Sequence, residues 1–300
     1  MRAGRALVLA VPWAWLALFL LAPCAIVLLI ALSESVDAVP PFSLARPGFD
    51  SLALVVTDPL YRAALLLSLK VAGLSTFACL LAGYPMALAI AQSAERRRAL
   101  LLLLVMLPFW TGFLMRINAW IGLLQDDGWI NTVLTAFGVA PLRLLYTDAA
   151  MYVGIVYTYL PFMVLPLYAR LSQLDPALLE AAADLGAPPW RAFLRITLPL
   201  SLPGVWAGAV LVFIPAVGEY VIPELLGGPQ AQLIGRVLWG EFFQNRDWPT
   251  AAALAVVLLA VLLVVPAGVL AALNVRTRRS SRSSRHRDGP PAAQSVVALR

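Results

Sequence analysis

Four acidic and aromatic residues in the sequence could bind a cation, although they could not carry out covalent chemistry on their own. Glu219 and Tyr220 are adjacent in a long apolar stretch, Glu224 follows five residues after Glu219, and Trp120 lies in an earlier apolar stretch. A carboxylate attracts a protonated alkylamine by charge, and an aromatic face attracts it through the ring quadrupole. We therefore predict that these four residues line a path for a cationic substrate.

Other interpretations of these residues stay open. Glu219 is one of three charged residues within the apolar stretches, and it could instead pair with Arg116 or Lys70, or anchor a helix at a membrane surface. Arg116 would repel a cation, so an ion pair suits it better, and Lys70 suits a position from which its ammonium group reaches the interface. Trp120 could belong to the belt of aromatic residues that marks a membrane boundary.

The sequence lacks the residue patterns of hydrolytic enzymes. Its single lysine, Lys70, follows Leu69, so a phosphate-binding loop of the form G-x-x-x-x-G-K-[ST] is impossible. Its single histidine, His286, excludes an H-E-x-x-H zinc site and a Ser-His-Asp triad. Cys24 and Cys79 both lie in apolar runs, which argues against a disulfide or a zinc site. We expect no catalytic residue, metal or cofactor, and any ATP that drives the protein must bind another polypeptide.

The elements that position these residues must lie in a lipid bilayer. Hydrophobic residues make up 61% of the 300 residues and charged residues only 13%, whereas soluble domains contain roughly 45–50% apolar and about 25% charged residues. The mean hydropathy is +0.85. A soluble protein of this size could not bury so much apolar surface, so the sequence predicts an all-α membrane protein.

Six stretches are long enough to cross the hydrocarbon core of a bilayer, which takes about 20 apolar residues per helix. We predict transmembrane helices at 6–32, 65–91, 99–124, 149–168, 202–222 and 250–273. The first stretch is longer than the roughly 7–15 residues of a signal-peptide core, so we expect it to be retained as a helix.

Positive charge is concentrated on one side of these predicted helices. The termini and the connections at 94–98 and 169–201 hold 15 basic and five acidic residues, whereas the connections at 33–64, 125–148 and 223–249 hold five basic and ten acidic residues. Because basic residues remain on the cytoplasmic side, we expect both termini in the cytoplasm. The net charge of +6 then reflects topology and does not indicate nucleic-acid binding.

The longest cytoplasmic connection has the pattern of two short helices. Asp175-Pro176 supplies an N-cap followed by proline at the first helical position. Gly186 is suited to end this first helix, and because Pro188-Pro189 prevents its direct continuation, we expect a second helix at 190–196. The first helix has an apolar stripe of Leu178, Leu179, Ala182 and Leu185. Such a stripe in water needs a protein partner, unless the helix lies against its own bundle.

This connection resembles a signature of the permease subunits of ABC importers. The signature E-A-A-x-x-x-G-x9-I-x-L-P is matched by Glu180, Ala181, Ala182, Gly186, Ile196, Leu198 and Pro199. The resemblance implies a type-I ABC importer permease fold, in which this loop is the coupling helix in a cleft of an ATP-binding subunit and Glu180 and Gly186 help to fix the docking. It also implies a location in a bacterial inner membrane. The family's other parts are implied as partners: a dimer of ATP-binding subunits, a second permease subunit and a periplasmic substrate-binding protein.

Further segments resemble permeases of the polyamine-importing branch. They are 107–113, 117–124, 159–168, 213–229, 234–239 and 241–249, and the block 213–249 is similar to putrescine-importer permeases in particular. The resemblance covers residues 65–273 and implies a polyamine, most of all putrescine, as the cargo. Spermidine, another organic cation, or an anion such as sulfate or an iron(III) chelate are alternatives, because permeases for such solutes share the E-A-A loop.

These observations divide the chain into three parts: 1–64 with the first transmembrane helix and a periplasmic loop, 65–273 with a five-helix transmembrane domain, and 274–300, a basic cytoplasmic tail expected to be disordered.

An ion-coupled secondary transporter is the main alternative class, but the two halves show no inverted repeat with matching broken helices. An intramembrane enzyme would need a paired Asp/Asp, Ser/Lys or His motif within the spans, and the sequence has none. Membrane lipid is an expected partner, and nucleic acid is not.

Overall fold

Long apolar helices dominate the computed structural model, which describes residues 2–264 of the chain and their side chains from Ala10 onward. Met1–Leu258 and Leu259–Arg300 form two separate units, and the packing described below is that of the first unit. The predicted disordered tail at 274–300 lies outside the described residues. The division of the chain after residues 64 and 273 remains a prediction.

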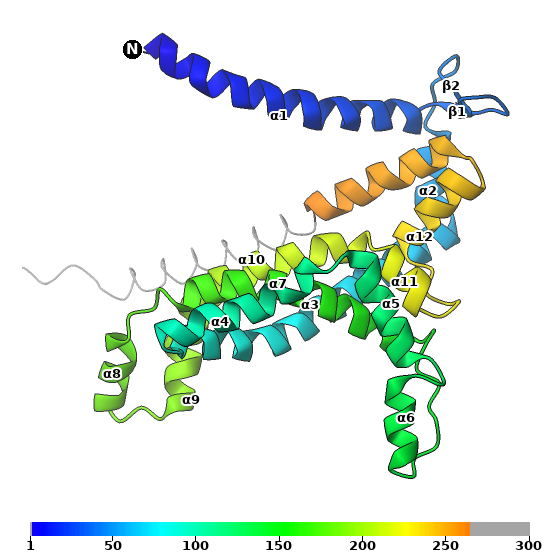
Figure 1. The fold of residues 1–300 in the computed structure, drawn as a ribbon. Coiled ribbons are helices and arrows are strands. Elements are labelled where there is room, and N and C mark those ends of the chain that lie inside the picture. Colours follow the sequence, from blue (N-terminus) through cyan, green and yellow to red (C-terminus); the bar gives the residue numbers. More distant parts are fainter. Residues whose placement is uncertain (1, 265–300) are drawn as a thin grey trace, which may run out of the picture. The chain divides into compact units, whose positions relative to one another are not determined.

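Helices account for most of the described chain and are labelled in chain order in Figure 1. They begin with α1 (Arg2–Ala31), α2 (Asp50–Thr57), α3 (Pro59–Gln92), α4 (Glu95–Met106), the 3-10 turn η1 (Leu107–Trp110), α5 (Phe113–Leu124), α6 (Trp129–Ala136) and α7 (Asp148–Leu171). They continue with α8 (Ala177–Asp184), α9 (Pro189–Ala192), the π-helical turn η2 (Phe193–Thr197), α10 (Leu198–Val217), α11 (Val221–Leu226), α12 (Ile234–Trp239), the π-helical turn η3 (Gly240–Gln244) and a helix at Trp248–Val264. Strands β1 (Glu34–Ser35) and β2 (Phe42–Ser43) form an antiparallel pair.

Several of these helices are long and apolar enough to cross a membrane. They are Ala10–Ala31, Pro59–Gln92, Asp148–Leu171 and Pro189–Val217, and a fifth results if the bent pair Glu95–Trp110 and Phe113–Ala136 is counted as one span. The helix Trp248–Val264 is apolar but shorter. The described residues thus supply four or five of the six predicted spans. The total of six and the cytoplasmic position of both termini remain predictions.

The predicted continuous helix at 99–124 is wrong in one respect, because it is interrupted near its middle. Helix α4 ends at Met106, η1 contains Pro108, and α5 begins after Gly112, so the two halves are bent by 90°. Proline lacks an N–H group and its ring clashes with the preceding helical turn. The backbone at Thr111 is extended, with ψ of 143°, and completes the break.

The predicted helix at 202–222 lies closer to the N-terminus than expected. The helical run begins at Pro189 and ends at Val217, after which the chain leaves helical geometry at Gly218 and forms the separate short helix α11. The predicted helix at 250–273 begins at Trp248, and the end predicted for it lies outside the described residues.

Helices α3, α7 and α10 run side by side and form the core of the first unit (Figure 1). A Cβ atom added at Gly208 of α10 would lie 2.7 Å from Met163 Sδ and 3.1 Å from the Met163 carbonyl oxygen on α7, so glycine allows the two helices to approach closely. The hydroxyl groups of Tyr84 on α3 and Ser201 on α10 share a buried hydrogen bond of 2.8 Å. Small residues and polar pairs of this kind hold helices together in lipid, where apolar burial gives little drive for association.

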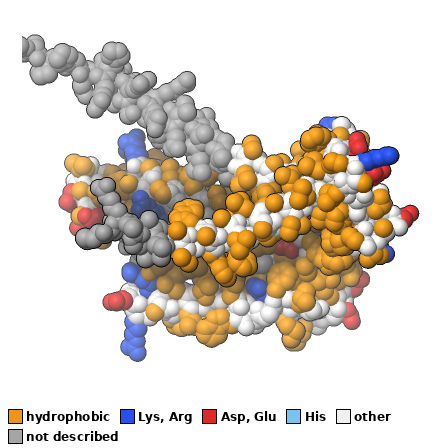
Figure 2. Space-filling model, turned by 90° about the horizontal axis from the view of Figure 1, so that it is seen from above, with side chains coloured by type: hydrophobic (Ala, Val, Ile, Leu, Met, Phe, Trp, Pro, Cys, Tyr) orange, Lys and Arg blue, Asp and Glu red, His pale blue; other side chains and the backbone are white. Residues whose placement is uncertain are grey.

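Charged side chains gather at the two ends of this unit, and the face between them that is visible in Figure 2 is mostly hydrophobic. One end carries α8 and α9, and the opposite end carries α11 and α12 (Figure 1). We call them the α8 end and the α12 end. Large apolar side chains on the long helices are exposed, for example Leu66, Leu81 and Leu114. An apolar surface of this extent needs a cover of lipid or protein.

Candidate functional site

Glu219 is buried and stabilises the start of helix α11. Its Oε1 atom accepts hydrogen bonds from the backbone N–H groups of Tyr220 (3.1 Å), Val221 (3.1 Å) and Ile222 (3.4 Å). Its Oε2 atom accepts a hydrogen bond from the Tyr159 hydroxyl group on α7. The free N–H groups at a helix N-terminus carry partial positive charge. The carboxylate is therefore stabilised without a cation.

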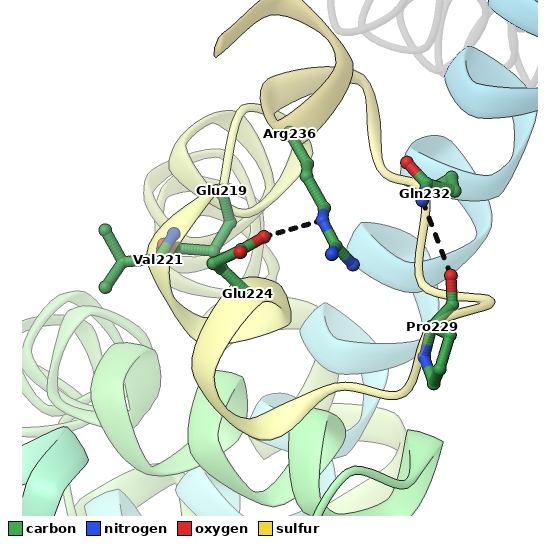
Figure 3. A network of polar contacts seen from close by, with 6 residues as sticks. All are labelled: Glu219, Val221, Glu224, Pro229, Gln232 and Arg236. Carbon is green, nitrogen blue, oxygen red and sulfur yellow. Dashed lines mark hydrogen bonds and ion pairs between the residues drawn. The ribbon is translucent and has the colours of Figure 1, made fainter. Parts of the chain in front are cut away.

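Glu224 lies further along α11 and forms an ion pair with Arg236 of α12 (Figure 3). Arg236 Nε is 2.6 Å from Glu224 Oε2, and both side chains are partly exposed. Helix α12 packs directly on the turn before α11, because a Cβ atom added at Gly235 would lie only 2.5 Å from the carbonyl oxygen of Gly218. This close packing brings the guanidinium within reach of the carboxylate.

A cavity of about 300 Å³ lies beside this ion pair at the α12 end. Its lining includes Tyr220, Glu224, Arg236, Trp239 and Glu241. The rings of Tyr220 and Trp239 are stacked, with centroids 4.5 Å apart and an interplanar angle of 16°. The pocket thus combines two carboxylates, one guanidinium and an aromatic wall, which leaves it with an excess of negative charge.

Two of the four predicted path residues, Tyr220 and Glu224, line this pocket. Glu219 lies at the start of the same helix but is 7% exposed and is not part of the lining (Figure 3). Sequence reasoning did not single out Arg236 and Glu241, because their spacing does not reveal that α12 and η3 fold back onto α11. The only clue in the sequence is that both residues belong to the block 213–249, which carries the resemblance described above.

Trp120, the fourth predicted path residue, lies with Arg116 in a different, largely apolar cavity of about 340 Å³. The Arg116 guanidinium carbon is 5.4 Å from the centroid of the Phe109 ring, which is a cation–π distance. Within the described part of the chain, Arg116 Nε and Nη1 have no hydrogen-bond partner. There, neither Arg116 nor Lys70 forms the ion pair with Glu219 that was considered from the sequence.

The E-A-A segment forms a helix and a sharp turn at the α8 end (Figure 1). Helix α8 starts at Ala177, whose N–H group donates a hydrogen bond of 3.0 Å to Asp175 Oδ1. Pro176, which was expected in the first helical position, lies just before the helix as its N-cap residue. Gly186 has a φ of +74°, a left-handed conformation that glycine adopts without strain, and it follows the end of the helix as predicted. The separate helix expected at 190–196 is wrong in extent, because helical structure starts at Pro189 and continues through η2 into α10.

The apolar stripe of α8 is exposed. Leu178, Leu179 and Leu185 are 44%, 37% and 88% exposed, and only Ala182 is buried. The described chain therefore does not cover the stripe, which speaks against the alternative that α8 lies against its own bundle. Among the other signature residues, Glu180, Ala181, Gly186 and Pro199 are exposed, and Ile196 and Leu198 are partly buried. An exposed apolar stripe beside an exposed carboxylate is a surface suited to a protein partner.

Comparison with known sequences places these features in a wider group. The model of a family described as "Binding-protein-dependent transport system inner membrane component" matches residues 6–280 of the chain. The spermidine/putrescine transport system permease protein PotB of Haemophilus influenzae is 40% identical over 269 residues, and the match covers 85% of this chain and 90% of that protein.

Two solved structures have a similar fold. A bacterial ABC transporter involved in the import of the acidic polysaccharide alginate gives a TM-score of 0.70 at 22% identity, covering 92% of this chain and 96% of that chain. A bacterial alginate ABC transporter in complex with an alginate pentasaccharide-bound periplasmic protein gives a TM-score of 0.68 at 22% identity, covering 88% and 92%. At this level of identity the likeness concerns the fold alone.

Proposed function

The chain belongs to the family of binding-protein-dependent transport system inner membrane components, and from this membership we propose that it is a permease subunit of an ATP-driven importer of polyamines. It is a transport component, and ATP is bound and hydrolysed by a separate subunit. The observation that carries the proposal is the exposed E-A-A segment at the α8 end, where an apolar stripe faces away from the rest of the described chain.

The proposed partner of α8 and α9 is an ATP-binding subunit. Glu180 and Gly186 present the turn, and Leu185, which is 88% exposed, would enter the partner's cleft. Closure of a dimer of ATP-binding subunits on ATP would then move α8 and α9 of this chain and the matching segments of a second permease subunit. The two subunits would alternate between inward-facing and outward-facing states, which is an allosteric rigid-body movement.

The proposed substrate path starts at the α12 end, which we place on the periplasmic side, with both termini in the cytoplasm. A periplasmic binding protein would deliver the cargo there. Tyr220 and Glu224 line the pocket at this end, Glu219 holds the turn that places Tyr220, and Trp120 offers an aromatic contact in the second cavity. Because two permease subunits would enclose the path, this chain supplies only part of the site.

Putrescine is the proposed cargo. The block 213–249 resembles putrescine permeases, and the PotB relative is named for both spermidine and putrescine. An excess of negative charge beside aromatic rings favours a protonated amine over an anion. Spermidine is the nearest alternative. An ion-coupled secondary transporter is not favoured, because the family is named for binding-protein-dependent transport.

The test is to reconstitute the chain with its ATP-binding subunit, second permease subunit and binding protein, and to measure ATP hydrolysis as putrescine, spermidine or sulfate is added. We expect putrescine to stimulate hydrolysis and to enter the vesicles. If spermidine alone stimulated hydrolysis, the cargo would be spermidine and not putrescine. If sulfate alone stimulated hydrolysis, the cargo would not be a polyamine. If the folded chain retained no ATP-binding subunit on purification, the proposal that it belongs to an ATP-driven importer would be rejected.

A further inference from the structure

Glu241 is the carboxylate of the pocket that has no cationic partner among the described residues. Its Oε1 atom accepts a hydrogen bond of 3.0 Å from the Tyr61 hydroxyl group, and its Oε2 atom accepts one of 2.9 Å from Asn245 Nδ2. Two neutral donors orient an ionised carboxylate but leave its charge uncompensated, and such a group can accept about four hydrogen bonds. Glu241 therefore has both charge and acceptor capacity left for another donor.

Glu224, the other carboxylate of the pocket, differs in this respect. Arg236 lies 2.6 Å from it and already neutralises its charge. A cation that approached Glu224 would have to displace the guanidinium, whereas Glu241 forms no ion pair with any cation of the described chain, and Arg236, which lines the same pocket, is already paired with Glu224. The excess negative charge of the pocket is thus located on Glu241.

The remaining lining suits the alkyl chain of a small amine. The stacked rings of Tyr220 and Trp239 offer an apolar wall, and the amide oxygens of Gln232 and Gln244 are further acceptors for N–H groups. The cavity of about 300 Å³ lies at the lower end of the roughly 300–1,000 Å³ that ligand pockets occupy. A small extended amine therefore fits better than a bulky chelate.

The backbone around Glu241 is unusual. Glu241 lies on the π-helical turn η3, and π-helical turns are rare and occur frequently at functional sites. Its donor Tyr61 lies in the first turn of α3, a helix that packs along α7 and α10. The position of the carboxylate is therefore tied to the helical core.

We propose that Glu241 binds one ammonium group of the cargo at the α12 end, that Tyr61 and Asn245 hold its carboxylate in position, and that the ring pair of Tyr220 and Trp239 contacts the alkyl chain. This inference rests on the proposed function and deepens it, because it names the carboxylate that first receives the amine. The chemistry requires a protonated amine and no metal or cofactor.

The test compares putrescine uptake by the reconstituted complex at a saturating concentration of putrescine-loaded binding protein, so that capture by the binding protein does not limit the rate. We expect Glu241→Gln to lower the uptake rate about tenfold, because it removes the negative charge that strengthens the hydrogen bond to the ammonium group. Glu241→Asp, which keeps the charge, should retain the rate within about threefold. Glu34→Gln is the matched control, since Glu34 is exposed on β1 and does not line this pocket, and it should transport like the wild type.

Each result decides between defined outcomes. An unchanged rate for Glu241→Gln, or equal losses for Glu241→Gln and Glu241→Asp, would show that the charge of Glu241 does not bind the cargo. As long as the wild-type complex takes up putrescine, neither of these results would contradict the proposed function. Absence of polyamine uptake by the wild-type complex would instead reject the proposed function. If the Glu241→Gln complex fails to retain its ATP-binding subunit, Tyr61→Phe takes its place. This variant keeps the carboxylate and should lower the rate about threefold, and an unchanged rate would overturn the inference.

Discussion

At the scale of single residues, Glu219 shows how a carboxylate can be buried in a membrane protein without a cation. Three backbone N–H groups at the start of α11 and the Tyr159 hydroxyl group surround it. The partial charge of a helix N-terminus replaces the ion pair that is usually invoked for such a group. These hydrogen bonds hold the turn between α10 and α11, which carries Tyr220, a residue of the pocket lining.

Replacement of Glu219 by glutamine is expected to lower the stability of the purified complex by about 1–2 kcal/mol, because it removes a charge-assisted set of hydrogen bonds. Tyr159→Phe should have a similar but smaller effect. The two changes should not be additive in a double-mutant cycle, because they remove the same contact. The stability of the two single variants and of the double variant is measured by thermal unfolding, with Glu34→Gln as the control. Additive losses would contradict a shared contact.

The partners of Glu219 also mark a limit of what the sequence reveals. The sequence indicates that a charge in this apolar stretch must be stabilised, because charges are costly in lipid. It does not reveal that Tyr159, 60 residues earlier, supplies the contact, since this requires α7 and α11 to be packed together. By contrast, the hydrogen bond that Asp175 accepts at the start of α8 and the end of the helix before Gly186 depend on local geometry, and both were predictable from adjacent residues.

At the scale of helices, glycines determine how closely α7 and α10 approach. We expect Gly208→Val to destabilise the complex by about 1–3 kcal/mol, because its side chain would collide with backbone atoms of Met163 that cannot rotate away. Gly73→Val is the matched control, since a Cβ atom at Gly73 meets no atom of the described chain within 4 Å. Equal thermal stability of the two variants would contradict the close packing.

The exposed stripe of α8 gives a second prediction at this scale. We expect Leu185→Ser to reduce the amount of ATP-binding subunit that co-purifies by about tenfold, because a buried apolar contact at an interface is worth more than about 1 kcal/mol. Leu44→Ser is the control, since Leu44 is 52% exposed and lies in the predicted periplasmic loop. Full retention of the ATP-binding subunit by the Leu185 variant would show that this leucine is not at the interface.

At the scale of the whole molecule, the expected importer permease fold is confirmed by the family match and by the similar solved structures. Apolar length and periodicity suffice to predict long helices such as α3 and α7. They do not predict the 90° bend between Trp110 and Phe113, because the hydropathy of a stretch is the same whether the helix is straight or broken. The contact between Glu241 and Tyr61 beside the pocket could not be predicted either, because the two residues are 180 positions apart in the sequence.

The predicted orientation can be tested on intact cells. In a chain with Cys24 replaced by serine, a cysteine at Glu34 should react with a membrane-impermeant thiol reagent, whereas a cysteine at Glu95 should react only after the cells are opened. The physical reason is the excess of arginine around 94–98, which remains on the cytoplasmic side. The reverse pattern of labelling would place the termini outside.

The direct continuation of α9 and η2 into helix α10 has a mechanical consequence. The 20 residues of α10 correspond to a rod about 30 Å long at 1.5 Å per residue, and no loop separates η2 and α9 from the part of α10 that packs on α7. A tilt of such a rod by about 10° about one end displaces the other end by about 5 Å. A push at Trp190 would thus be passed on without an intervening loop to the other end of α10, next to the turn that carries Glu219 and Tyr220.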